Sequence, residues 1–295
     1  MKITLFVLFA MLLSCSGAAL ADEASLNTAR IEQLTGLHGK LNTDEGVFKV
    51  TYPRSDIHAT VAGVRMNPAL GLTAWAAFER AGEHVMVMGD IVVLENEIGP
   101  VMSAALDSGL EVTALHNHFV WDEPKVMFMH IGGMGDEETL ASAVGQVFAK
   151  LREVILSKPQ APVAQIDPIA TSLDTSRLAG ILGTTGSFGN GVYKVVFGRH
   201  VEMNGIRVGG EMGVNTWAAF AGSDRLAVVD GDFATLESEL QSVLKALRAG
   251  GVNVVAIHNH MTFEQPRVVF LHYWGIGPAE SLARTLRAAL DTQHL

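Results

Sequence analysis

The chain has 295 residues, 48% of them hydrophobic, and a formal net charge of -10. This length fits one large domain or two of ordinary size, with enough apolar residues to bury a core. The acidic balance argues against nucleic acid or an anionic membrane surface as the main partner, because no basic stretch is present to neutralise phosphates.

The first 21 residues are typical of a secretory signal peptide. One lysine precedes an apolar run that is too short to span a bilayer as a helix, so we expect no transmembrane segment. Ala19-Leu20-Ala21 suits ordinary signal peptidase, whereas Leu12-Leu13-Ser14-Cys15 has the form of a lipobox. We therefore expect a periplasmic or extracytoplasmic protein, exported by its signal peptide and lipid-anchored if Cys15 is the processing site. No other cysteine is present, which excludes disulfides within the mature chain.

The rest of the chain contains two copies of one module. His116-Asn117-His118 recurs as His258-Asn259-His260, and 258 minus 116 gives an offset of 142. The match needs no gap between His58 and Gly135, but a small insertion or deletion near Ser55 changes the offset upstream. We predict repeat 1 over residues 26–156, a proline-containing linker over 157–171 and repeat 2 over 172–295.

Within the first copy, the apolar pattern predicts the elements in order. Three strands are expected near residues 47–54, 59–66 and 72–79, followed by a buried strand from 85 to 94 and a helix that Gly109 ends. Two β-rich runs, 111–119 and 125–131, then suggest a hairpin, and a second helix covers 140–151. Gly133 and Gly135, with Gly275 and Gly277 in the second copy, are expected to form tight turns before that helix.

This order predicts the fold class. We expect an α+β protein with two tandem repeats, each a largely antiparallel sheet with two helices on one face, in the order βββ-βαββα. A pseudo-twofold axis is expected to relate the two copies.

Three histidines in each copy form the main candidate site. His116 and His118, two residues apart on a strand, point to one face. If the hairpin pairs Val120 with Val126, His116 lies directly across from His130. Three imidazoles suit a divalent transition metal, with zinc favoured over copper, nickel or iron, and leave a coordination position open. The candidate metal ligands are His116, His118, His130, His258, His260 and His272.

Carboxylates near the predicted strand and helix ends are candidates for a general base. Asp90 and Glu95 repeat as Asp232 and Glu237, and these four are the candidate catalytic residues. Glu123 and Glu264 lie in the predicted hairpin loops, but they are not equivalent positions.

Other repeated or clustered residues have weaker functional interpretations. His58 and His200 recur without a cluster around them, so a structural and a functional role both stay open. Trp75 and Trp217 are expected in the core. Met86, Met88, Met127 and Met129 are interpreted as packing residues, because none has a methionine as its counterpart.

The two histidine motifs resemble the LppY/LpqO-like family of exported bacterial proteins, domain of unknown function 1259. The resemblance rests on Leu115-His116-Asn117-His118 with Pro124–His130, and on Ile257–Met261 with Pro266–His272. It covers essentially the whole mature chain. It implies a family of undefined activity in which some members look like lipoproteins.

Three functions stay open at this point. The first is an exported enzyme that uses a histidine-held metal to hydrolyse an envelope substrate. The second is a non-catalytic periplasmic protein that binds a metal or a small ligand. In the third, the histidines only stabilise the sheet. The substrate, the metal, the activity of each copy and the oligomeric state are left undetermined.

Overall fold

The computed structural model describes residues 25–293. The predicted signal peptide and Cys15 lie outside these residues, as do the last two residues of the chain. Among the described residues, no helix is long and apolar enough to cross a membrane.

The first copy consists of three helices around a six-stranded part of the main sheet. Its elements are α1 (Thr28–Thr35), β1 (Gly39–Asn42), β2 (Val47–Pro53), β5 (Thr73–Ala81), β6 (His84–Leu94), α2 (Glu95–Asp107), β7 (Glu111–His116), β9 (Val126–Gly135) and α3 (Glu137–Ser157). The short strands β3 (Thr60–Val61), β4 (Val64–Arg65) and β8 (Asp122–Glu123) form a separate three-stranded sheet, and a 3-10 turn, η1 (Pro68–Leu70), follows β4.

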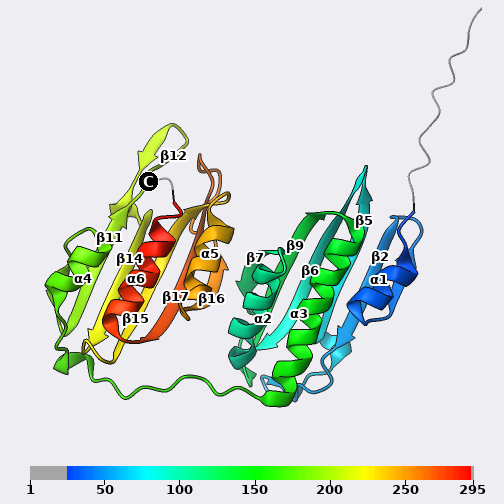
Figure 1. Cartoon of the computed structure of the whole chain (residues 1–295), viewed down its shortest axis with the longest axis horizontal. Coiled ribbons are helices and arrows are strands. Elements are labelled where there is room, and N and C mark those ends of the chain that lie inside the picture. The colour runs from blue at the N-terminus through cyan, green and yellow to red at the C-terminus, as the bar shows by residue number, and fades with distance from the viewer. Residues whose placement is uncertain (1–24, 294–295) are drawn as a thin grey trace, which may run out of the picture.

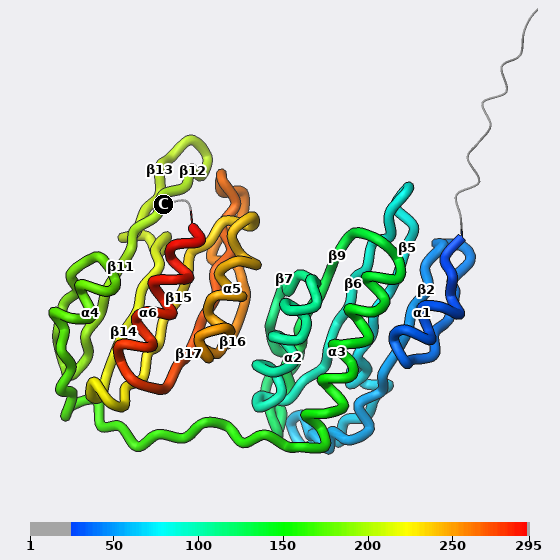
Figure 2. The backbone as a smooth tube through the Cα atoms, viewed as in Figure 1, coloured from blue at the N-terminus to red at the C-terminus, as the bar shows by residue number. Residues whose placement is uncertain are grey.

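The second copy repeats this arrangement. Its elements are α4 (Thr175–Leu182), β10 (Ser187–Gly189), β11 (Val192–Gly198), β12 (Val201–Met203), β13 (Ile206–Val208), η3 (Gly210–Met212), β14 (Asn215–Gly222), β15 (Ala227–Leu236), α5 (Leu240–Ala249), β16 (Asn253–His258), β17 (Val268–Gly277) and α6 (Ala279–Leu290). Figure 2 shows the chain between α3 and α4 passing from one copy to the other in an extended path, interrupted by the short turn η2 (Pro168–Ala170).

One twelve-stranded sheet runs through both copies. Its strand order is β1-β2-β5-β6-β9-β7-β16-β17-β15-β14-β11-β10, which reads as the same sequence of equivalent strands from either end. At the centre, β7 pairs antiparallel with β16 through Leu115 and Ile257, which are themselves equivalent positions 142 residues apart. Self-pairing of equivalent residues is what a twofold axis produces. The predicted pseudo-twofold relation is therefore present, with its axis between these two residues.

All the helices lie on one face of this sheet (Figure 1). Side chains alternate between the faces of a strand, so Val85, Val87, Ile91 and Val93 of β6 point towards the helices and are fully buried. Apolar residues of α2 and α3, such as Val101 and Phe148, complete this core. The opposite side, which we call the open face, carries Asp90 and both histidine clusters.

The helical layer also joins the two copies. The side-chain amide of Gln241 in α5 accepts from the backbone N–H of Val112 at 2.9 Å and donates to its carbonyl at 3.0 Å. Arg248, also in α5, donates to the hydroxyl of Ser103 in α2 at 3.2 Å. These bonds hold α5 against the first copy, next to the strand pair at the axis.

The predicted α+β class, the antiparallel sheet and the strand, helix, strand, strand, helix order are confirmed. Short elements α1 and β1, with their counterparts α4 and β10, were not predicted. The prediction for the four glycines was wrong, because Gly133, Gly135, Gly275 and Gly277 continue β9 and β17 rather than forming turns. At Gly133 an added Cβ would lie 3.1 Å from Leu140 of α3, so the missing side chain lets the helix approach the strand.

A buried ion pair fixes the start of the segment that crosses to the open face. We call this segment, residues 54–72, the first flap, and its counterpart, residues 199–214, the second flap. The fully buried guanidinium of Arg54 makes two hydrogen bonds of 3.0 Å to the carboxylate of Glu97, at the first turn of α2, and two more to Asp56. In the second copy, Arg199 pairs in the same way with Glu239.

Removing Arg54 should destabilise the protein strongly, because the Glu97 carboxylate is then left buried without its partner. We expect Arg54→Met to lower the free energy of unfolding by about 3–5 kcal/mol, measured by urea denaturation. The matched control is Arg30→Met, which breaks the more exposed pair with Glu138 and should cost far less, because solvent screens an exposed ion pair. An equal decrease in the free energy of unfolding in the two variants would contradict the idea that burial makes the Arg54 pair more important.

Candidate metal centre

Three histidines of the first copy converge on the open face. His116 ends β7, His118 follows it by two residues, and His130 lies in the neighbouring strand β9. The Nε2 atoms of His116 and His130 are 3.1 Å apart. The ring centroid of His116 lies 5.1 Å from that of His118 and 5.1 Å from that of His130. One nitrogen from each ring lies within 4.8 Å of the other two. The three side chains can therefore hold one metal ion.

The strand register that achieves this differs from the predicted one. His116 pairs with Phe128 rather than with His130, and Ala114 lies opposite His130, after an irregularity between Val112 and Ala114. The observed register is shifted by two residues from the predicted one. His116 and His130 therefore stay on the same face of the sheet and become diagonal neighbours. The predicted hairpin closure was wrong because Asp122 and Glu123 form β8, which pairs with β3 of the first flap.

An aromatic ring fixes the orientation of the second histidine in each motif. His118 stacks on Phe128 with ring centroids 3.3 Å apart and planes at 5°. In the second copy His260 stacks on Phe270 at 3.5 Å and 9°. Phe270 is fully buried in a small core with Val201 and Val208 of the second flap. The flap therefore supports the phenylalanine, which in turn supports the histidine.

The loop after the first motif is held by a carboxylate that sequence reasoning did not single out. The side chain of Asp122 accepts from the backbone N–H of Val126 at 2.8 Å and from Lys125 at 2.5 Å. Glu264, at the equivalent position, accepts from the N–H of Val268. These two acids fix the start of the second strand of each motif, and neither is part of the histidine cluster.

Asp90 lies beside the first histidine cluster. It pairs across the strands with His130 on one side and with Trp75 on the other. Its Oδ1 atom is buried and has no hydrogen-bond partner. Burial raises the pKa of this carboxyl group, although the nearby histidines oppose the shift. A buried acceptor without a partner is costly, so this oxygen is available to a proton or a cation at the site.

The second copy has the same residues in a different arrangement. His258 lies 5.0 Å from His260 and 4.9 Å from His272 between ring centroids, but its ring is inclined by 61° to that of His260. His260 turns towards Asp232, with Nε2 to Oδ2 at 3.5 Å, and the buried Nδ1 of His258 has no partner. Among residues 25–293, a group of three ligand atoms this close is found only in the first copy.

Burial also changes the protonation of the histidines. It lowers the pKa of His118; the nearby Asp90 opposes this shift, while His116 and His130 add to it. The pKa values of His258 and His260 are lowered, again mainly by burial. A lower pKa keeps these rings neutral at pH 7, which is the form that binds a metal.

The other predicted site residues lie away from the rings. Glu95 is exposed at the first residue of α2, and Glu237 is exposed and pairs with Arg267 at 3.1 Å. No interaction within the described part of the chain joins either to a histidine, and their catalytic role stays a prediction. His58 and His200 are exposed in the flaps. Trp75 and Trp217 are only half-buried, on the open face, each under a lysine ammonium, so their prediction as core residues was wrong.

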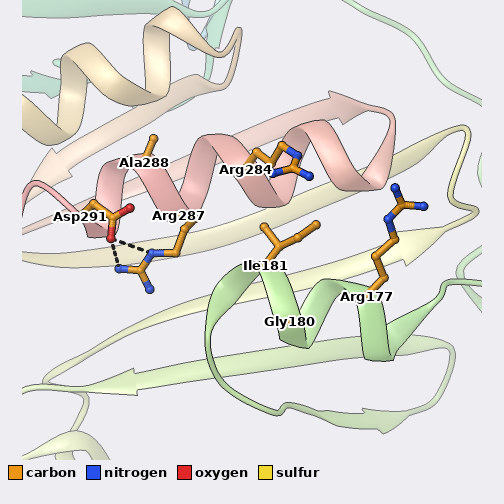
Figure 3. Close-up of a pocket in the computed structure, with 7 residues that line it drawn as sticks. All are labelled: Arg177, Gly180, Ile181, Arg284, Arg287, Ala288 and Asp291. Carbon is orange, nitrogen blue, oxygen red and sulfur yellow. Dashed lines mark hydrogen bonds and ion pairs between the residues drawn. The ribbon is translucent and has the colours of Figure 1, made fainter.

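A pocket of about 550 Å³ lies elsewhere, between α4 and α6 on the helical side (Figure 3). Three arginines line it, and each forms an ion pair with a carboxylate. Arg287 pairs with Asp291 at 2.7 Å, while Arg177 and Arg284 both pair with Glu280. The pair of Arg177 with Glu280 joins α4 to α6. Each of the three arginines already has a carboxylate partner, so none is left unpaired for a ligand.

Comparison with known proteins gives a family and no activity. A family model described as Domain of Unknown Function (DUF1259) matches residues 29–150 and 176–292, one segment in each copy. No curated protein matches the sequence. Among solved structures, the chain is similar to the crystal structure of a trimeric bacterial microcompartment shell protein, PduB, at 8% identity over 86% of this chain and 89% of that chain. The TM-score of 0.23 is too low to support an argument about fold or function.

Asp232 gives a pH-dependent prediction for the metal-free protein. Burial raises its pKa from 3.8 to about 6, so the folded state binds more protons than the unfolded state between these values. The contribution of this group to stability therefore falls as pH rises through that window. We expect Asp232→Asn to stabilise the protein by about 2–3 kcal/mol at pH 7.5, and by much less near pH 4. Urea unfolding at both pH values measures this, and a pH-independent effect would contradict it.

Proposed function

Because the chain belongs to the family described as Domain of Unknown Function (DUF1259), which carries no stated activity, we propose its function from the site itself. The protein binds a divalent transition metal, with zinc favoured, at His116, His118 and His130, and uses it to hydrolyse an envelope substrate. The observation that carries this proposal is the convergence of three imidazole nitrogens within 4.8 Å on the open face.

The donor set fits a cation. Two nitrogens on a tetrahedral zinc ion are roughly 3.3 Å apart, given Zn–N bonds of about 2.0–2.1 Å, and the Nε2 atoms of His116 and His130 are 3.1 Å apart. Two neutral rings cannot direct lone pairs at each other without a proton or a cation between them. The unpartnered Oδ1 of Asp90 adds a further acceptor beside them. Zinc is favoured because three histidine imidazoles are a common ligand set for it in proteins.

The residues around the rings support hydrolysis. When bound, a zinc ion in such a site lowers the pKa of a water molecule and polarises a carbonyl group. His116, His118 and His130 would hold the ion, and His118 is the exposed residue of the three. Asp90, whose pKa is raised by burial, would accept a proton at its unpartnered Oδ1 atom. Phe128 keeps the ring of His118 in place while this occurs.

A second function, non-catalytic capture of a metal or a small polar ligand, is favoured by one observation. The triad lies on the sheet face opposite the helices, and His118 is exposed, whereas catalytic sites usually enclose much of the substrate. In both functions the protein acts outside the cytoplasm, because residues 1–21 are typical of a signal peptide. It is anchored by lipid if Cys15 is the processing site, and its partner is a small molecule or envelope component rather than nucleic acid.

Metal analysis of the purified full-length chain tests the binding site. After reconstitution with zinc, copper, nickel or iron in turn, we expect at least one bound metal ion per chain. A variant combining His116→Ala, His118→Ala and His130→Ala should lose this ion. The matched control, with alanine at His258, His260 and His272, should retain it, because the first copy has the convergent rings. An absence of bound metal, or equal loss from both variants, would overturn the proposal.

The Asp90→Asn variant distinguishes metal-dependent hydrolysis from non-catalytic capture. With 4-nitrophenyl acetate and bis(4-nitrophenyl) phosphate as probes, we expect zinc-dependent turnover that falls by about 10²–10⁴-fold in this variant, while the zinc content is unchanged. Asp232→Asn in the second copy is the matched control and should leave turnover intact. A zinc-loaded protein with no turnover of either probe would reject hydrolysis for these substrate classes and leave capture as the function.

A further inference from the structure

Three methionines form a group on the open face of the first copy, beside the histidine site. Met86 of β6 and Met134 of β9 are direct cross-strand partners, and Met88 follows Met86 by two residues on the same face. Directly paired residues have Cβ atoms about 4.5–5.5 Å apart, and diagonal neighbours about 7–8 Å. Methionine has a long flexible side chain, so the three sulfur atoms can meet above the sheet.

These methionines do not serve as core packing. Met88 is 57% exposed and Met134 is 64% exposed, whereas Met129, which points to the helices from the same strand as Met134, is fully buried. Met86, Met88 and Met134 instead line one shallow pocket of about 290 Å³ together with Glu111 and Thr113 of β7. The interpretation of Met88 as a packing residue was therefore wrong, whereas Met86 is half-buried and Met129 packs in the core.

The second copy lacks this group altogether. The equivalent positions are Val228, Asp230 and Ile276, and Val228 pairs with Ile276 as Met86 pairs with Met134. The backbone framework is thus the same in both copies, but the sulfur atoms occur in one only. An exposed apolar surface would be served equally well by valine and isoleucine. What methionine adds is a thioether sulfur.

We propose that Met86, Met88 and Met134 form a binding site for Cu(I). Thioether sulfur is a soft ligand, and among first-row metals soft ligands of this kind select Cu(I). The neutral donors need no deprotonation, and the pocket at the sheet surface gives the ion direct access from solvent. Glu111 also lines this pocket. Its carboxylate supplies a negative charge near the cation, while the three sulfur atoms remain the ligands.

The methionine site is separate from the histidine site but adjacent to it. Along β6, Met88 is followed two residues later by Asp90, whose cross-strand partner is His130. Two residues of strand span about 6.6–6.8 Å. The proposal does not depend on zinc binding or hydrolysis at the histidines, because the donor atoms and the metal are different.

Cu(I) titration tests this proposal under anaerobic conditions, with ascorbate present and bicinchoninate as the competing chelator. Every protein carries Cys15→Ser, because a thiolate would bind Cu(I) itself. A triple variant of Met86→Leu, Met88→Leu and Met134→Leu should lose one tightly bound equivalent of Cu(I) and retain its zinc content. Methionine and leucine are similar in volume, so we expect these variants to fold.

Two comparisons make the result specific. Met127→Leu with Met129→Leu, on the helical side of β9, is the matched control and should bind Cu(I) like the parent. The triple alanine variant of His116, His118 and His130 should lose zinc and retain the methionine-bound Cu(I), for which copper X-ray absorption should show sulfur neighbours. Unchanged Cu(I) binding in the triple leucine variant, or copper with only nitrogen and oxygen neighbours, would overturn the proposal. The methionines would then be an apolar contact surface.

Discussion

The antiparallel pairing of β7 with β16 is the constraint on which the rest of the structure depends. It occurs at Leu115 and Ile257, where each copy meets its own equivalent, so one continuous sheet forms without an exposed edge at the centre. An exposed edge strand would present unpaired backbone groups to other chains. Because the axis is perpendicular to the sheet, both copies place their helices on the same side (Figure 1). The alternation of side chains along β9 and β17 then places both histidine clusters on the opposite side.

The division between the two faces organises the chemistry. On the helical side, apolar residues of strands and helices supply the main core and the stability. The open face is free of helices, so polar and soft side chains can stand there without disturbing that core. The flaps cover only part of it, and the ion pair of Arg54 with Glu97 fixes where the first flap begins. The flap in turn supports the aromatic ring under the second histidine of the motif, as Phe270 illustrates in the second copy.

Duplication followed by divergence explains the differences between the two open faces. Both copies have three histidines, an aspartate and a stacked phenylalanine, but only the first brings three ring nitrogens together among the described residues. In the second, His260 is drawn towards Asp232, and the methionine positions are occupied by other residues. Because both copies share one backbone framework, the open face of the first copy can specialise while the second copy still completes the sheet.

The sequence by itself determined the duplication, the element types and the face on which the histidines lie, because these follow from local periodicity and the offset of 142 residues. It could not determine the register, since the loop after His118 is diverted to pair with the first flap. The pairing of Met86 with Met134, the burial of Asp90 and the meeting of β7 with β16 were also decided only by the tertiary structure. They depend on contacts between residues far apart in the chain, which no local pattern records.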